Sequence, residues 1–271
     1  MKRILFILFP LLLLTSCEEV ISVDLDTQAP RLVIDGYMRW VKGTAGNEQS
    51  IRLSTTAGFY ESTVPAVSGA SVIVTDTDGN VFTFLEDGTT GIYRCFNFIP
   101  QLEMQYTLTV TVNGQVYTAV ETMKPAPEIT DITQESDGGF TGDEIEVRAF
   151  FTDNAATDDF YLYRFKTDYN AIPLFEAIED RFINGNLFFA LFSDADLSAG
   201  DQLQIDICGI SERYYNYMNI LTGVAGSNSG SPFSTPPATV RGNLLNTTDE
   251  SNFALGYFAA SEVETATYTV Q

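Results

Sequence analysis

Short stretches in which apolar and polar residues alternate recur along this chain, and a period of two is typical of β-strands. Between residues 30 and 124, turn-forming residues such as Asp78-Gly79-Asn80 and Asn113-Gly114 separate these stretches and predict hairpins. The stretches are RLVIDGYMRW (31–40), SIRLSTT (50–56), SVIVTD (71–76), VFTFLE (81–86), YTLTVTV (106–112) and VYTAVET (116–122). About six or seven short strands over this length predict an immunoglobulin-like β-sandwich.

The segment Lys124-Pro125-Ala126-Pro127 interrupts the pattern, because proline donates no backbone hydrogen bond and favours an extended connection. We therefore expect a sandwich over residues 30–124 and a second β-rich domain over 125–271. One helix is predicted over 211–223, with Ser211 as its N-cap. The fold class is mainly β: an N-terminal immunoglobulin-like β-sandwich followed by a second β-rich domain with one main helix. The strands expected in the second domain span 144–151, 160–167, 187–192, 201–208, 253–260 and 263–270.

The N-terminus has the parts of an export signal. Residues 1–16 combine a basic start, an apolar run and small residues directly before Cys17. The run is shorter than the ~20 apolar residues that a membrane-spanning helix needs. The stretch LTSC (14–17) resembles the bacterial lipoprotein signal, so we expect Cys17 to be the lipidated first residue of the mature protein. The acidic stretch over 17–29 is then a solvated tether, a signal for display on the outer surface, or both.

Charge and composition exclude several function classes. The net charge of −22 becomes about −24 without Lys2 and Arg3, which argues against nucleic acid as a partner and leaves cations and neutral ligands open. The chain has no histidine, so it has no Ser-His-Asp or Cys-His catalysis and no imidazole metal ligand. Cys95 and Cys208 form either a disulfide or two buried thiols.

The helix and one strand contain the candidate binding residues. Tyr214 and Tyr217 fall on the helix face expected to pack against the sheet, whereas Tyr215 is the freer ring. In FYLYRFK (160–166), alternation places Arg164 and Lys166 on one face. This basic pair is expected either to bind an anionic group or to pair with acids on a neighbouring strand.

Acidic groups are the remaining candidates for chemistry. Asp153, Asp158 and Asp159 fall in one polar loop, and Glu176, Glu179 and Asp180 fall in another. Oxygen-only clusters can hold calcium, but solvated loops explain both groups better. DTDGN (76–80) lacks the spacing of a calcium loop and predicts a hairpin turn. We expect no catalytic residue, no metal site and no cofactor.

Several stretches carry a family resemblance. SERYYNYMNILTG (211–223), GSPFSTPPATVRGNLLN (230–246) and FALGYFAAS (253–261), together with RLVIDGYM (31–38) and DDFYLYRF (158–165), resemble a family of Bacteroidota lipoproteins known as domain of unknown function 4249. The resemblance covers nearly the whole mature chain, and the series from Pro232 to Phe258 is its most specific part. It implies an envelope lipoprotein that accompanies TonB-dependent outer-membrane transporters. It carries no catalytic residues over to this chain.

Two classes of function follow. The expected function is that of a non-catalytic lipoprotein, anchored by lipid to the outer membrane on its periplasmic side or at the cell surface, which helps a TonB-dependent transporter to capture a nutrient. The alternatives are a carboxylate- or calcium-dependent glycan-active enzyme, or a module for surface adhesion or structure. The absence of histidine favours the first class.

Overall fold

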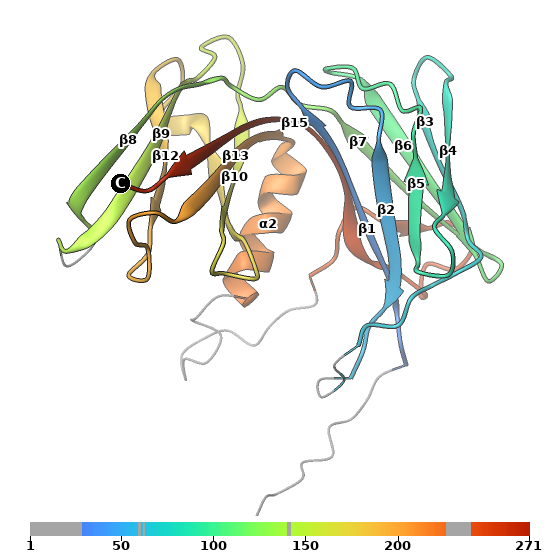
Figure 1. Ribbon diagram of the computed structural model, residues 1–271. Coiled ribbons are helices and arrows are strands. Elements are labelled where there is room, and N and C mark those ends of the chain that lie inside the picture. Colours follow the sequence, from blue (N-terminus) through green and yellow to red (C-terminus); the bar gives the residue numbers. More distant parts are fainter. Residues whose placement is uncertain (1–28, 59–60, 62, 140–141, 226–239) are drawn as a thin grey trace, which may run out of the picture.

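Two β-rich lobes lie side by side and are bridged by one long strand (Figure 1). The computed structural model describes residues 29–58, 61, 63–139, 142–225 and 240–271. The bridging strand is β15 (Leu255–Thr269), and the helix α2 (Glu212–Ala225) lies between the lobes beneath it. The fold is mainly β, which confirms the predicted fold class.

The first lobe contains the six strands expected from the alternating stretches and a seventh, short strand over Ile92–Cys95, and together they form a β-sandwich. In β3, for example, Val72, Val74 and Asp76 are buried while their neighbours are more exposed. Asn113 and Gly114 have φ values of 50° and 73°, which is the left-handed conformation that a type I′ hairpin turn requires. The strands are β1 (Leu32–Val41), β2 (Gln49–Thr55), β3 (Ser71–Asp76), β4 (Val81–Glu86), β5 (Ile92–Cys95), β6 (Gln105–Val112) and β7 (Gln115–Thr122).

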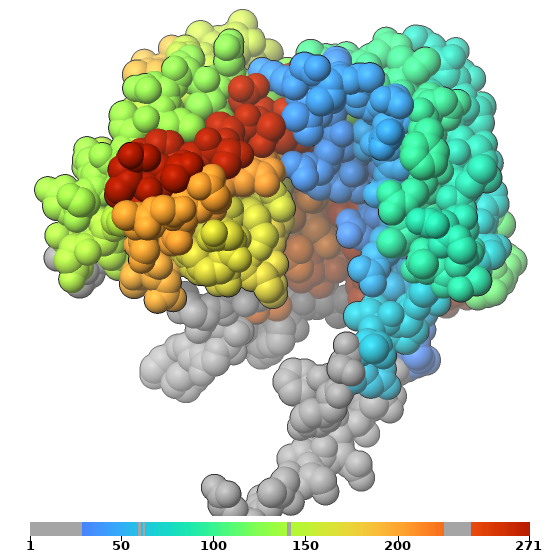
Figure 2. Space-filling model, in the orientation of Figure 1, coloured from blue at the N-terminus to red at the C-terminus, as the bar shows by residue number. Residues whose placement is uncertain are grey.

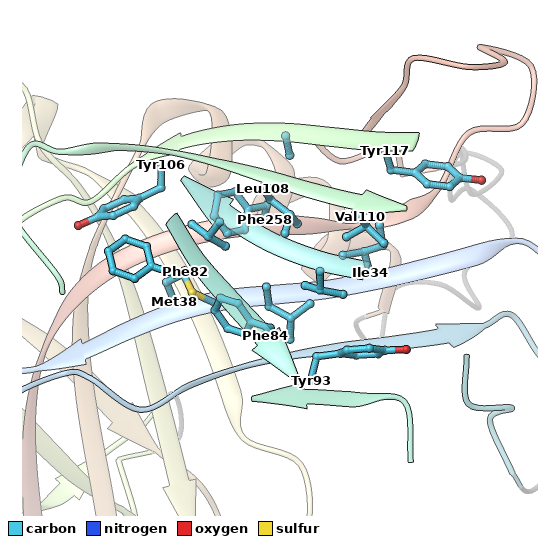
Figure 3. Packing of buried hydrophobic residues seen from close by; sticks show 14 of the residues in the cluster. Ile34, Met38, Phe82, Phe84, Tyr93, Tyr106, Leu108, Val110, Tyr117 and Phe258 are labelled. Atoms are coloured by element: carbon cyan, nitrogen blue, oxygen red, sulfur yellow. The ribbon is translucent and has the colours of Figure 1, made fainter. Parts of the chain in front are cut away.

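The core of the first lobe also receives residues from the end of the chain. Figure 3 shows Phe258 beside Leu108 in this core. Leu244, Ala254 and Ala260 belong to the same buried cluster. The short strand β14 (Leu245–Asn246) pairs with β7. The boundary at residue 125 therefore stays a prediction, and the chain returns to the first lobe after completing most of the second.

The second lobe closes a separate core between two sheets. Its three-stranded sheet consists of β8 (Ile129–Gly138), β9 (Glu144–Thr152) and β12 (Leu187–Ser193), and the facing strands are β10 (Phe160–Thr167), β11 (Leu174–Glu179), β13 (Gln202–Ile210) and the end of β15. The sequence did not predict β8 and β11. Both are edge strands with few buried positions, so they lack the alternation that marks a half-buried strand. Glu176 and Glu179 accordingly lie on β11 rather than in a loop.

The strand β15 joins the two lobes into one twelve-stranded sheet. It pairs in parallel with β1 from Val33↔Leu255 to Val41↔Val263. It then pairs antiparallel with β13 from Cys208↔Val263 onward. The sequence predicted two strands here, 253–260 and 263–270. This was wrong, because the polar residues between them are buried in a continuous strand, where the carboxylate of Glu262 accepts a hydrogen bond from the backbone N–H of Ala126 at 2.9 Å.

A buried ion network reinforces this junction. Asp206 on β13 is fully buried, and its Oδ2 lies 2.6 Å from Arg39 Nη2 on β1 and 2.9 Å from Arg164 Nη1 on β10. Its Oδ1 accepts hydrogen bonds from Gln204 and Thr265. Burial alone would raise the pKa of Asp206, but the two hydrogen bonds and the two guanidinium charges hold that pKa below its usual value.

Both described cysteines are free and buried. Cys95 lies in the core of the first lobe, and Cys208 lies beneath α2. The sequence left a disulfide and two buried thiols as alternatives for this pair, and the structure shows two buried thiols. Within the described ranges, no helix has the length and apolar character needed to cross a bilayer. Cys17, the acidic tether up to residue 28 and the prolines at 232, 236 and 237 lie outside the described residues.

Candidate functional site

Helix α2 packs on the sheet where the two lobes meet. Ser211 caps it as predicted, since its Oγ accepts a hydrogen bond from the backbone N–H of Tyr214 at 3.2 Å. The hydroxyl of Ser211 also donates to Glu121 on β7 at 2.9 Å, which ties the start of the helix to the first lobe. Tyr214 and Met218 are buried against the sheet, as their helical spacing predicts, whereas Tyr217 on the same helix face is only partly buried. The helix continues two residues past Gly223.

A pocket of about 490 Å³ lies between this helix and the sheet. We call it the tyrosine pocket, because four of its lining residues are tyrosines. Figure 2 shows a recess between the two lobes in this part of the molecule, with atoms of α2 at its back. The volume is within the range typical of small-molecule sites. The pocket is lined by Asp35, Tyr37, Phe175, Tyr214, Tyr217, Met218, Leu221, Thr222, Gly256, Tyr257 and Ala259.

The tyrosine rings support one another through direct contacts. The ring centre of Tyr257 lies 4.7 Å from that of Tyr214 and 4.8 Å from that of Tyr217, and Tyr37 lies 5.7 Å from Tyr214. These separations are typical of favourable aromatic pairs. The hydroxyl of Tyr257 donates to the carboxylate of Glu121 at 3.2 Å. Ring packing therefore holds the aromatic wall in place. The carboxylate of Glu121 supports it as well, because it accepts hydrogen bonds from both Tyr257 and Ser211.

The lining residues combine neutral rings with one carboxylate. Burial raises the pKa of all four tyrosine hydroxyls, so the rings are uncharged at neutral pH. The charge of Asp35 contributes to the raised pKa of Tyr214 and Tyr217. Partial desolvation raises the pKa of Asp35 itself, although this residue remains exposed at the surface, and the charge of Arg52 on the neighbouring strand opposes that shift. The pocket can therefore bind apolar groups along its walls and a hydrogen-bond donor at Asp35.

The three binding residues named from the sequence lie outside this pocket. Tyr215 is half-buried and packs on Phe160, with 5.1 Å between ring centres. The guanidinium of Arg164 pairs with the buried Asp206, so the cross-strand alternative accounts for it. The ammonium of Lys166 donates to the backbone carbonyl of Asn170. A ligand-binding role for these residues stays a prediction.

The structure brings together acids that the sequence placed in two separate groups. Oxygen atoms of Asp153, Asp159 and Asp180 all lie within 4.8 Å of one another. Protein groups already bond each of them: the hydroxyl of Tyr161 and the N–H of Gly185 donate to Asp153, Thr157 donates to Asp159, and the N–H of Asp159 donates to Asp180. These bonds explain the cluster as a loop-supporting network.

Sequence reasoning missed most of the tyrosine pocket. Asp35 and Tyr37 lie in a predicted strand, Tyr257 lies in another, and Phe175 lies on β11, which was not predicted. The one local signal is Asp35 itself, an acid within the apolar stretch LVIDGYM. Asp35 shares a pocket with aromatic residues that are distant in the sequence, and this arrangement depends on the parallel pairing of β1 with β15.

Sequence comparison relates this chain to one protein family. The family model described as "Domain of unknown function (DUF4249)" matches residues 18–267. No match is found among curated proteins.

Several solved structures are similar in part. One is a DUF4785 family protein from Legionella pneumophila, with 10% identity and a TM-score of 0.27; the match covers 66% of this chain and 52% of that chain, so it spans about half the length of that structure. Another is a segment of two fibronectin type-III domains from chicken tenascin, with 8% identity, a TM-score of 0.22, and coverage of 67% of this chain and 91% of that chain. A cytokine receptor complex has 8% identity, a TM-score of 0.25, and coverage of 66% and 82%.

Proposed function

Because this chain belongs to the DUF4249 family, whose function is unknown, we propose a function from its tyrosine pocket and its N-terminal signal. The protein is a non-catalytic lipoprotein of the outer membrane that captures a small ligand for a TonB-dependent transporter in nutrient uptake. The N-terminal signal, the acidic tether and the resemblance to Bacteroidota lipoproteins support the location and the partner.

The tyrosine pocket is the observation that carries this proposal. It is large enough for a small molecule, and its walls are mostly aromatic and apolar. Of the described residues that line it, Asp35 alone is acidic, whereas glycoside hydrolysis ordinarily requires two carboxylates that flank the bond to be cleaved. The lining therefore favours binding over catalysis.

The lipid anchor gives such a pocket a physical role. A tethered module and a transporter in the same membrane meet at a high effective concentration, so even a weak contact between them can operate. The anchor and the pocket together support ligand delivery more than they support an enzyme that acts alone.

Replacing Cys17 by alanine is expected to abolish membrane attachment, because the acylated thiol is the proposed anchor. The variant should appear as an uncleaved or soluble exported protein that takes up no labelled fatty acid. Cell fractionation with metabolic fatty-acid labelling measures both effects. Ser16→Ala, which keeps a small residue before the cysteine, is the control and should remain labelled and membrane-bound. Membrane retention of the Cys17→Ala variant would remove the lipoprotein proposal.

Gentle solubilisation of native membranes and capture of a tagged copy should bring a TonB-dependent transporter in near-stoichiometric amount. The control bait carries residues 1–30 fused to an unrelated soluble domain, so that it shares the anchor and lacks the folded module. Recovery of the transporter with both baits would show that membrane proximity alone explains it. A protein that purifies alone and hydrolyses a glycan, with activity lost on one Asp or Glu substitution, would favour the enzyme alternative instead.

A further inference from the structure

Asp35 supplies an unpaired negative charge at the tyrosine pocket. It lies on β1, and its side chain is exposed where it borders the pocket. Its carboxylate makes neither a hydrogen bond nor an ion pair with any other described residue. Arg52 occupies the position opposite it on β2 and acts on it only through the longer-range charge interaction. The carboxylate is therefore free to accept hydrogen bonds from a ligand.

The rings around Asp35 suit a cation as well as an apolar group. The face of a neutral tyrosine ring attracts ammonium groups through its quadrupole, and the attraction increases where water is excluded. Asp35, Tyr214 and Tyr217 line the same pocket, so a ligand in it can meet the carboxylate and the rings together. One end of the pocket thus combines a carboxylate with electron-rich ring faces.

The rest of the pocket is mostly apolar and offers no positive charge to an anionic ligand. Phe175, Met218 and Leu221 supply apolar walls. Among the described lining residues, none is basic. The chain as a whole carries a net charge of −22, and its field attracts cations and repels anions. An apolar body that carries one positive charge matches every part of this lining.

We propose that the tyrosine pocket binds small organic amines in their protonated form, with the ammonium group at Asp35 and the apolar body against Phe175, Met218 and Leu221. This inference rests on the proposed function and specifies the class of ligand that the pocket binds. It requires no covalent step.

Calorimetry on the purified full-length protein in detergent can compare three probes of similar size: 2-phenylethylamine, 2-phenylethanol and phenylacetate. At neutral pH the amine should bind about tenfold more tightly than the alcohol, because a hydrogen bond to a charged group adds that much affinity. Phenylacetate should bind more weakly than either. Equal affinity of amine and alcohol, tighter binding of phenylacetate, or no binding of the amine at millimolar concentration would overturn the proposal.

Asp35→Asn keeps the size of the side chain and removes its charge. This variant should lose about tenfold in affinity for the amine and retain its affinity for the alcohol. Tyr217→Leu keeps an apolar wall and removes a ring face, so it should weaken amine binding about threefold more than alcohol binding. Asp131→Asn, which removes the same charge from the exposed surface of β8, is the control and should bind all probes like the wild type. An Asp131→Asn effect as large as that of Asp35→Asn would attribute amine binding to net charge and overturn the assignment to the pocket.

These measurements separate the inference from the proposed function. Capture of a transporter by a protein that binds no amine would overturn the ligand class and leave the transporter role intact. Amine binding by a protein that captures no transporter would overturn the transporter role and leave the ligand class intact.

Discussion

Gly256→Ala is expected to destabilise the protein by about 4 kcal/mol or to prevent folding, because a side chain at this position collides with the backbone of the first strand. A Cβ atom on Gly256 would lie 2.1 Å from the carbonyl oxygen of Ile34. The backbone cannot shift to relieve this contact, since Gly256 pairs with Ile34 in the parallel register of β1 and β15. Its φ of 93° adds strain for any L-residue. Soluble yield and the urea denaturation midpoint measure the effect.

Gly79→Ala is the matched control for this prediction. Gly79 has a similar φ of 88°, but a Cβ atom there would meet no other atom within 4 Å. The substitution should therefore cost about 1 kcal/mol, which is the conformational penalty alone. Equal destabilisation by the two substitutions would show that the contact with Ile34 is not what makes Gly256 necessary.

Asp206→Ala is expected to lower the free energy of unfolding by about 3 kcal/mol. The substitution leaves the guanidinium groups of Arg39 and Arg164 without the carboxylate that both contact. It also removes the acceptor for Gln204 and Thr265. Removing one partner from a buried ion pair can cost more than the pair itself contributes, because the remaining charges lose their counter-charge. The side chains of Arg39 and Arg164 are 33% and 21% exposed, so their guanidinium groups stay only partly desolvated. Chemical denaturation measures the difference, with Asp87→Ala as control.

Asp87 pairs with Arg94 at 3.2 Å, but its side chain is 59% exposed. Its replacement should cost less than about 1 kcal/mol, as is usual for surface ion pairs. A loss as large as that from Asp206→Ala would contradict the importance assigned to burial. The two variants remove the same functional group, so burial and the number of partners are the main differences between them.

The contribution of Asp206 should also depend on pH. Its pKa is lower in the folded protein than the ordinary value of 3.8, so the folded state favours the ionised form. This stabilisation is complete above pH 3.8 and disappears as the pH falls through the lower, folded-state pKa. The difference in stability between wild type and Asp206→Ala should therefore shrink in strong acid and stay constant near neutral pH. A difference that grew on acidification would contradict the lowered pKa.

Local features of the sequence predicted the local structure well. Alternation located six of the seven strands of the first lobe, and Asn113-Gly114 marked a hairpin turn with the expected positive φ values. The helix appeared at the predicted cap, Ser211. These predictions succeed because strand periodicity, turn chemistry and capping depend on residues within a few positions of one another.

Features without a local signature were missed. The edge strands β8 and β11 bury few side chains, so their sequences do not alternate. The break predicted between residues 260 and 263 rested on polar residues that are buried in the structure. The partner of Glu262, Ala126, lies 136 positions away in the sequence, and no local pattern can indicate such a contact.

The sequence by itself determined the β class of the fold, its hairpins, its helix and the restriction of its chemistry to groups other than imidazole. The tertiary structure decided that β15 pairs with β1, and this pairing brings Asp35 and Tyr37 together with Tyr214, Tyr217 and Tyr257. It also decided that Asp206 meets Arg39, 167 positions distant. The physical reason is that hydrogen bonding and side-chain alternation within a strand specify its faces, whereas the choice of a distant partner depends on packing of the whole core.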